Sequence, residues 1–391
     1  MGDKVLGEVA VINMGQSPKG DSYNELGQGK PLLNGPTEFG PYHPSPKTWT
    51  STPTKLCKQG DLLFCVRGST TGRMNWADQE YCLGRGLAAF SAKSGSRADT
   101  KYLYYSLVYA LPSLLGLSAG SVFPNLSQKD FAGFEIGWPT EKIRYTIADL
   151  LGSLDDKIEL NRRMNATLES MARAMFKAWF MGNEKSGEWR IGKLCEIASF
   201  AKGVSYRSAD LVEESETALV TLKSMGRGGG YREDGLKPFV GKYKPEQRVF
   251  PGEIVVAQTD LTQAADVIGR AARVEPNENH PILVASLDLV IVRPKNGFTT
   301  EYLNGVLSRS EFSDHAYGYT NGTTVLHLSS KALPEYGLTI PPFSVVAEYT
   351  KMVSPIYSQI DNNNGQSRAL AALRDALLPR LMSGEVRVGE R

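Results

Sequence analysis

Residues 141–180 read EKIRYTIADLLGSLDDKIELNRRMNATLESMARAMFKAWF and predict one long amphipathic helix. Only Asn161 and Asn165 interrupt its apolar stripe. At 1.5 Å per residue the helix would be about 60 Å long, which is more than a small domain needs for its core. The stretch therefore predicts a spacer. The stripe follows a 4-3-4 spacing along one helical face and consists of Ile147, Leu151, Leu154, Ile158, Leu168, Ala172, Met175 and Trp179.

A second stretch repeats the first after a shift of 202 residues. Asn161 then aligns with Asn363, and a buried polar residue on such a stripe fixes helix register. Two unrelated core helices would not share this register, so we expect the helices to pair antiparallel along their stripes. The aligned positions are Leu151, Leu154, Ile158, Asn161, Leu168, Met175 and Trp179 in the first stretch and Val353, Ile356, Ile360, Asn363, Leu370, Leu377 and Leu381 in the second.

The second stretch is less regular than the first. Pro355 removes one helical hydrogen bond, and residues 362–365 read Asn-Asn-Asn-Gly, which lowers helix propensity. We therefore expect the second helix to be bent or interrupted.

Length and composition limit the number of domains and the class of protein. A chain of 391 residues has room for two or three domains. Its 44 Lys and Arg nearly balance 42 Asp and Glu, so binding of nucleic acid would require locally clustered charge. The four cysteines show no CxxC spacing, and no secretory signal or long apolar run is visible. These features predict a cytoplasmic protein without a membrane segment.

Each predicted helix follows a module, and the second module repeats the first. The expected bounds are 1–139 for module one, 140–187 for the first helix and its linker, 188–342 for module two, and 343–391 for the second helix and tail. The paired motifs are Gly60-Asp61-Leu62-Leu63 with Gly252-Glu253-Ile254-Val255, Gly72-Arg73 with Gly269-Arg270, Thr100-x-Tyr102-Leu103 with Thr300-x-Tyr302-Leu303, and Leu126-Ser127 with Leu328-Ser329.

Short strand-like runs such as 61–66 and 87–90, with a helix near 101–107, predict α+β modules with long loops. Antiparallel spacer helices would relate the two modules by a pseudo-two-fold axis. Two modules at fixed spacing suit a ligand with two separated half-sites, and double-stranded DNA is the leading candidate.

Catalytic motifs are weak. Gly116-Leu-Ser118-Ala-Gly120 fits a nucleophile elbow, but no helix pattern follows the serine, and Gly318-Tyr-Thr320-Asn-Gly322 occupies the equivalent place as a second polar loop. Residues 187–193 lack the hydroxyl of a P-loop, and residues 84–89 fit a turn better than a dinucleotide fingerprint. The four histidines lack metal-ligand spacing. We expect no catalysis and no metal site on this chain.

Basic and polar loops supply the candidates for contact with DNA, because Arg and Lys favour guanine while Ser, Thr and Gly loops favour phosphate. Module two has Thr259-Asp260 where module one has Arg67-Gly68, so the modules should read different half-sites. The candidates are Arg67, Ser69, Arg73, Arg85 and Ser121 in module one, and Lys202, Tyr206, Arg207, Arg227, Arg232, Arg270, Tyr319, Thr320, Asn321 and Thr323 in module two.

The helix at 141–180 and the C-terminal ALLPRLMSGEVRV (376–388), with the paired GDLL and GEIV motifs, make the chain resemble the specificity subunits of type I restriction–modification systems. The resemblance covers essentially the whole chain. It implies two target-recognition domains that bind a bipartite, asymmetric DNA site. It also implies two methylation subunits docked around the helices, with S-adenosylmethionine on those partners. A restriction subunit, where present, would bring ATP and Mg²⁺.

Two other functions stay open. The chain could be a protein–protein scaffold with two modules on a helical ruler, which an apolar module face would favour. It could also be a hydrolase that uses Ser118. Loss of function in Ser118→Ala with DNA binding intact would favour the hydrolase.

Overall fold

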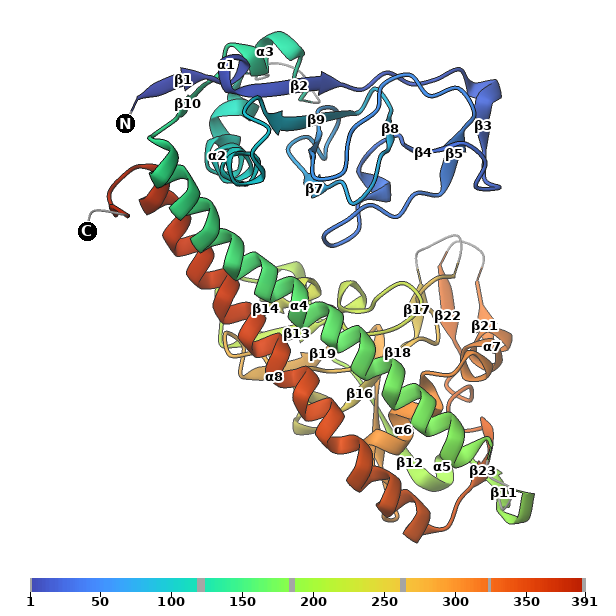
Figure 1. Ribbon diagram of the computed structural model, residues 1–391. Helices are drawn as coiled ribbons and strands as arrows, with labels where there is room; N and C mark the ends of the chain where they lie inside the picture. Colours follow the sequence, from blue (N-terminus) through green and yellow to red (C-terminus); the bar gives the residue numbers. More distant parts are fainter. Residues whose placement is uncertain (1, 118–123, 183–186, 261–264, 323–324, 389–391) are drawn as a thin grey trace. The chain divides into compact units, whose positions relative to one another are not determined.

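The computed structural model describes residues 2–117, 124–182, 187–260, 265–322 and 325–388 (Figure 1). The chain is α+β, as the sequence predicts. It divides into two compact units. Unit 1 joins Met1–Leu160 to Ser367–Arg391, and unit 2 is Asn161–Gln366. Among the described residues, no helix is both long enough and apolar enough to cross a membrane.

Unit 1 contains two four-stranded sheets, ordered β2-β9-β6-β7 and β3-β5-β4-β8, and a ribbon of β1 and β10. Every residue of β6 is buried, because Leu62 and Phe64 enter one core while Leu63 and Cys65 enter another on the opposite face of the sheet. The elements are β1 (Asp3–Val5), α1 (Leu6–Val9), β2 (Ala10–Met14), β3 (Tyr23–Asn24), β4 (Lys30–Leu33), β5 (Thr48–Thr50), β6 (Leu62–Cys65), β7 (Met74–Trp76), β8 (Cys82–Leu83), β9 (Leu87–Ala92), α2 (Arg97–Gly116), α3 (Gln128–Ala132) and β10 (Glu135–Gly137).

Helix α2 covers the β2-β9-β6-β7 sheet. It begins after Ser96, whose hydroxyl accepts a hydrogen bond from the Asp99 amide at 3.3 Å. Its buried leucines join a core in which Phe64, Phe90 and Phe131 meet edge to face, with ring centroids 5.0–5.9 Å apart. The predicted strands at 61–66 and 87–90 are β6 and β9, and the predicted helix at 101–107 lies within α2.

Unit 2 repeats the strand order of the first sheet, whereas its second four-stranded sheet is ordered differently. Its sheets run β12-β20-β16-β18 and β14-β13-β19-β15, and β11 pairs with β23. A three-stranded sheet, β17-β22-β21, is added. The elements are β11 (Arg190–Lys193), α5 (Leu194–Ile197), β12 (Ala198–Lys202), β13 (Thr217–Val220), β14 (Lys237–Pro238), β15 (Arg248–Val249), β16 (Ile254–Ala257), β17 (Thr259–Asp260), β18 (Ala271–Arg273), β19 (Ile282–Ala285), β20 (Leu289–Pro294), α6 (Thr300–Leu307), α7 (Ser310–Gly318), β21 (Thr320–Asn321), β22 (Leu326–Leu328) and β23 (Gly337–Ile340).

Corresponding hydrogen bonds confirm the repeat. A Cβ added to Gly15 would lie 2.2 Å from the Gly84 carbonyl oxygen, and one added to Gly203 would lie 2.0 Å from that of Ser286. Both modules therefore require glycine at this crossing. The matched amide-to-carbonyl bonds include Gly15–Leu87 with Gly203–Leu289, Leu6–Phe134 with Leu194–Tyr336, Gly72–Cys65 with Gly269–Ala257, and Leu126–Val66 with Leu328–Gln258.

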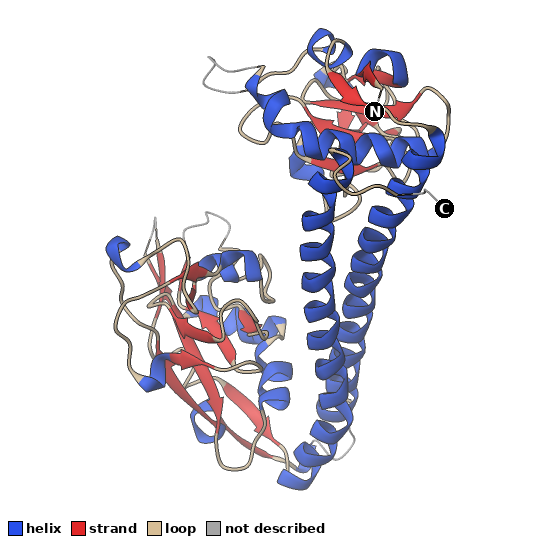
Figure 2. Cartoon of the chain, turned by 90° about the vertical axis from the view of Figure 1, so that its left-hand side faces the viewer, coloured by secondary structure: helices blue, strands red, loops and turns tan. Residues whose placement is uncertain are grey.

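The two predicted long helices are α4 (Glu141–Phe180) and α8 (Phe343–Met382), both drawn as continuous coils in Figure 2. Every predicted stripe residue is buried or half-buried within its unit. These residues are Leu151, Leu154, Ile158, Leu370, Leu377 and Leu381 in unit 1, and Asn161, Leu168, Met175, Trp179, Val353, Ile356, Ile360 and Asn363 in unit 2.

The helices pack antiparallel inside each unit. In unit 1, Ile147 and Leu151 of α4 share a core with Leu378 and Leu381 of α8. In unit 2, the Asn161 amide donates to Gln366 Oε1 at 2.9 Å. At the other end of the same helix pair, the rings of Phe176 and Tyr349 meet edge to face, with centroids 5.9 Å apart. Residue numbers thus rise along α4 as they fall along α8.

Asparagines link the helices in unit 2. Asn363 Nδ2 donates to Asn165 Oδ1 at 2.8 Å, and Asn165 Nδ2 donates to Asn364 Oδ1 at 2.6 Å. Gln359 Nε2 donates to Asn363 Oδ1 at 2.7 Å. These bonds satisfy polar groups that the stripe would otherwise bury without partners.

The expected interruption of the second helix is wrong, because α8 runs unbroken through Pro355 and the asparagine run. Contacts with the rest of unit 2 explain this. Ser354 Oγ donates to Glu301 Oε1 at 2.7 Å, and Tyr357 Oη accepts from Asn304 Nδ2 at 2.8 Å. Tertiary packing of this kind overrides a weak local propensity.

Candidate functional site

Arg67 and Arg85 lie at one end of the β6–β9 pair in unit 1. The ladder ends at Cys65 and Leu87, and the Val66 amide then donates to the Gly86 carbonyl at 2.9 Å. Arg85 sits in the tight turn that precedes β9, closed by the Leu87 amide on the Gly84 carbonyl at 3.1 Å. Both arginines are one residue beyond the Val66–Gly86 bond, and both are exposed.

The two arginine side chains have no acidic partner among the residues that the structure describes. The backbone around them is firmly held, because the Leu126 amide donates to Val66 O at 3.0 Å and Thr71 Oγ1 donates to Pro124 O at 3.1 Å. Unit 1 therefore presents two exposed guanidinium groups on a well-held backbone, and such groups suit an anion or a guanine edge.

A neighbouring loop, Gln16–Lys19, is not among the candidates predicted from the sequence. The Gln16 amide donates to Leu83 O at 2.8 Å, and Ser17 Oγ accepts from the Arg85 amide at 3.2 Å, so the loop lies beside Arg85. Gln16 and Lys19 are exposed. The repeat could have found this loop, because Gly15 corresponds to Gly203, and Tyr206 and Arg207 shortly after Gly203 were already candidates.

The other unit 1 candidates differ in how far hydrogen bonds within the fold already engage their side chains. Ser69 is exposed on the loop between β6 and β7. Arg73 is exposed as well, but its Nη1 and Nη2 donate to the carbonyls of Pro36 and Phe39 at 3.3 and 3.4 Å, which commits part of its guanidinium to the fold. Ser121 lies outside the described residues, as does the nucleophile-elbow serine, Ser118. The turn at 84–87 agrees with the rejection of a dinucleotide fingerprint.

The corresponding end of unit 2 has different chemistry. The Gln258 amide donates to Asp288 O at 2.8 Å, and the Leu289 amide donates to Ser286 O at 2.9 Å. These bonds match Val66–Gly86 and Leu87–Gly84, so Thr259 corresponds to Arg67 and Leu287 to Arg85. The predicted difference between modules at Thr259-Asp260 thus falls at this end of the strand pair.

Asp260 is used by the fold of unit 2. Its side chain is buried, and its Oδ2 accepts hydrogen bonds from the amides of Val267 and Ile268 at 2.7 and 2.9 Å. The residue that follows Thr259 therefore supports the loop that leads into β18.

Lys202, Tyr206 and Arg207 flank this end on the segment that leaves β12. Lys202 and Arg207 are exposed and Tyr206 is half-buried. The Leu287 amide donates to Val204 O at 2.8 Å, which places the segment against the Leu287 turn. The structure therefore brings these three candidates to the end of unit 2 that corresponds to Arg67 and Arg85.

Arg227 and Arg232 are partly engaged elsewhere in unit 2. Arg227 Nε is 3.9 Å from Asp266 Oδ2, a long and exposed pairing. Arg232 Nε donates to Asp234 Oδ1 at 3.0 Å, and this contact raises the pKa of the guanidinium and lowers that of the carboxyl. Neither contact commits the whole side chain.

The second G-x-[ST]-x-G copy is not a plain loop, which corrects the sequence interpretation. Gly318 ends α7, and Thr320 and Asn321 form strand β21. Tyr319 Oη donates to Glu335 Oε2 at 3.1 Å, and Thr320 Oγ1 donates to Tyr317 O at 2.8 Å. Asn321 is exposed, and Thr323 lies outside the described residues.

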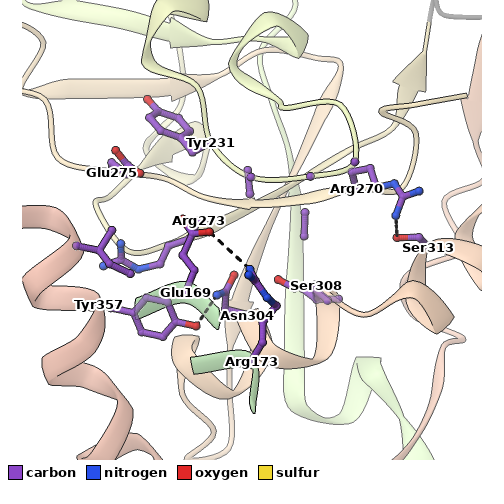
Figure 3. Close-up of a pocket in the computed structure, with 17 residues that line it drawn as sticks. Glu169, Arg173, Tyr231, Arg270, Arg273, Glu275, Asn304, Ser308, Ser313 and Tyr357 are labelled. Carbon is purple, nitrogen blue, oxygen red and sulfur yellow. Dashed lines mark hydrogen bonds and ion pairs between the residues drawn. The ribbon is translucent and has the colours of Figure 1, made fainter. Parts of the chain in front are cut away.

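Arg270 lines a pocket of ≈ 230 Å³ in unit 2 (Figure 3). Its Nη1 donates to Ser313 Oγ at 3.0 Å, and Arg273 forms a two-point ion pair with Asp361 at 2.7 and 2.6 Å. Arg173 of α4 approaches Glu169 at 3.6 Å. Acidic side chains thus offset the positive charge around the pocket, which therefore fits a joint between module and helices better than an anion site. No group of His, Cys, Asp or Glu among the described residues could hold a metal ion.

Comparison with known proteins shows what the chain is similar to. Residues 2–170 match the family model of the type I restriction modification DNA specificity domain. The chain as a whole is similar to specificity subunits of type I restriction enzymes, which confirms the resemblance drawn from the sequence.

Two relatives come from Methanocaldococcus jannaschii. The type I restriction enzyme MjaIX specificity subunit is 26% identical over 367 residues, covering 86% of this chain and 80% of the relative. The putative type I restriction enzyme MjaX specificity subunit is 34% identical over 171 residues, which is 44% of this chain and 40% of the relative's length. The crystal structure of a type-I restriction-modification system S subunit from M. genitalium shares the fold, with a TM-score of 0.59, 16% identity and coverage of 97% and 96% of the two chains.

Proposed function

We propose that this chain is the DNA-recognition subunit of a type I restriction–modification enzyme and catalyses no reaction itself. Its two modules bind the two halves of a bipartite, asymmetric site in double-stranded DNA. The observation that carries this proposal is a pair of exposed arginines, Arg67 and Arg85, which have no acidic partner within the described segments. They lie at a strand end that the duplicated module repeats with other side chains. Such an arrangement supplies base and phosphate contacts in one module and a different set in the other.

In this proposal, partner subunits carry out the methylation and restriction reactions. Two methylation subunits dock on α4 and α8, bind S-adenosylmethionine and flip the target adenine out of the duplex. A restriction subunit, where present, brings ATP and Mg²⁺. Helix α4 offers apolar side chains for docking, since Leu150 and Leu160 are exposed in unit 1 and Met164 and Met171 in unit 2. The functional domains are taken as 1–139, 140–187, 188–342 and 343–391, in a cytoplasmic protein.

The test is to map modified adenines in DNA from cells that express this chain with its methylation subunits. A bipartite motif with modified adenine in both parts is the expected result. A contiguous motif would contradict two separate modules. A folded complex that modifies no motif would make the protein–protein scaffold the better function.

The helices should also act as a ruler between half-sites. Inserting four stripe-preserving residues into both α4, after Leu160, and α8, after Gln366, adds about 6 Å at 1.5 Å per residue. We expect the gap in the methylated motif to lengthen by roughly two base pairs, at 3.4 Å each. A four-residue insertion at Gly95, in an exposed turn of unit 1, is the control and should leave the gap unchanged. An unchanged gap in the helix variant would reject the ruler.

A further inference from the structure

Two pairs of residues occupy the same place in the two modules. Arg67 and Thr259 each follow the residue whose carbonyl accepts the amide of Leu126 or Leu328, at 3.0 and 2.8 Å. Arg85 and Leu287 each take the second position of the turn that leads into β9 or β20, as the Leu87–Gly84 and Leu289–Ser286 bonds show. The backbone is thus nearly the same, while the side chains differ in charge.

In unit 1 this end offers guanidinium groups. Arginine donates two parallel hydrogen bonds to O6 and N7 of guanine, and no other base presents two acceptors there in the major groove. Arg67 and Arg85 make no ion pair among the described residues, so their donors are available.

In unit 2 the two matched positions carry no charged side chain. Leu287 is 47% exposed, which is unusual for a leucine in a polar turn. Thr259 Oγ1 donates to Asp288 Oδ1 at 2.8 Å, and Gln258 Nε2 donates to the Leu287 carbonyl, so the side-chain donors of Thr259 and Gln258 are already engaged. What these two positions offer a base is the methyl groups of Leu287 and Thr259. The base feature that such groups contact in the major groove is the C5-methyl of thymine.

Building on the DNA-binding function proposed above, we infer that Arg67 and Arg85 read guanine in one half-site, while Leu287 and Thr259 read thymine at the equivalent step of the other. The asymmetry of the DNA target then originates at one matched strand end. The two modules share a backbone frame, and the base that each selects is set by these side chains.

The experiment maps adenine methylation with the complete complex for Arg67→Lys/Arg85→Lys and for Leu287→Ala. Lysine keeps the charge but loses the two-point fork. In the lysine variant we expect discrimination against non-guanine bases to fall roughly 10- to 100-fold in one half-site only, with overall DNA binding largely kept. Leu287→Ala should relax the thymine position of the other half-site by about fivefold. Co-purification with the methylation subunits verifies that each variant is folded.

Arg97→Ala is the matched control. Arg97 is an exposed arginine of the same unit, at the start of α2, where loss of a positive charge does not weaken the helix. This variant should keep the parental motif. A bipartite parental motif that stays unchanged in both test variants would overturn the inference and leave the proposed function standing. Absence of any bipartite motif in the parental complex would instead reject the proposed function.

Discussion

Asp155→Ala is expected to lower the free energy of unfolding of unit 1 by about 2–3 kcal/mol. The Asp155 carboxylate on α4 joins two elements of that unit. It accepts a hydrogen bond from Tyr105 Oη of α2 at 2.6 Å and one from Arg374 Nη1 of α8 at 2.6 Å. Its side chain is only 14% exposed, so alanine would leave Arg374 half-buried without this partner. The loss is smaller than for a fully buried pair, because Arg374 is still 27% exposed and also pairs with Asp375.

The protonation state of Tyr105 favours its hydrogen bond to Asp155. Burial raises the pKa of Tyr105, and the nearby Asp155 carboxylate raises it further, so the phenol stays protonated and donates its hydrogen bond throughout the neutral range. The measurement is calorimetric unfolding of the complete chain. The transition of unit 1 should fall by roughly 4–12 °C in Asp155→Ala.

Asp156→Ala is the control, because it removes the same group one residue away. Asp156 is 57% exposed and pairs with Lys101 at 3.0 Å, so its loss should cost less than about 1 kcal/mol. Equal destabilisation by the two variants would show that Asp155 has no special part in holding unit 1 together.

Asn363→Leu should destabilise unit 2 by about 1–3 kcal/mol, although it replaces a polar side chain by an apolar one in a core. The change removes the donor to Asn165 Oδ1 and the acceptor for Gln359 Nε2, and Asn165 is buried. An unsatisfied buried amide costs more than the new leucine contributes through burial. Chemical denaturation measures the loss, and Asn362→Leu, at an exposed position beside it, should be nearly neutral.

The double variant Asn165→Leu/Asn363→Leu should recover most of this loss, because neither asparagine remains buried without its hydrogen-bond partner. It should also widen the range of gap lengths that the complex accepts between half-sites. Apolar stripes without the asparagines allow the helices to slide by a turn. A double variant whose loss equals the sum of the two single losses would contradict this coupling between residues 165 and 363.

Much of the fold followed from the sequence, because repetition and periodicity are long-range signals. The alignment of Asn161 with Asn363 predicted the contact region that the structure shows, with the Asn161 amide also donating to the Asn363 carbonyl at 3.3 Å. The paired module motifs fall at matching hydrogen bonds. The candidate arginines Arg67 and Arg85 were named separately, and the tight turn before β9 brings them to one strand end.

Other features depended on contacts that a local pattern does not contain. Pro355 and the asparagine run predicted a bent or interrupted helix, but α8 is not interrupted, because α6 and α4 supply partners along it. Arg270 fitted a DNA-contact pattern, yet its guanidinium donates to Ser313 inside a pocket. Gln16–Lys19 contains one charged residue, and only the alignment with residues 204–207 draws attention to it.

The division of the chain bears on its synthesis. Unit 2 is one continuous segment, whereas unit 1 needs residues from both ends of the chain. Arg374 follows Asp155 by 219 residues, so at translation rates of about 5–20 residues per second the ribosome delivers this partner roughly 10–40 s later. During that interval the first half of α4 has left the ribosome while its apolar stripe still lacks α8. We expect the nascent chain to be most open to chaperones, and to an early-binding partner subunit, in this period.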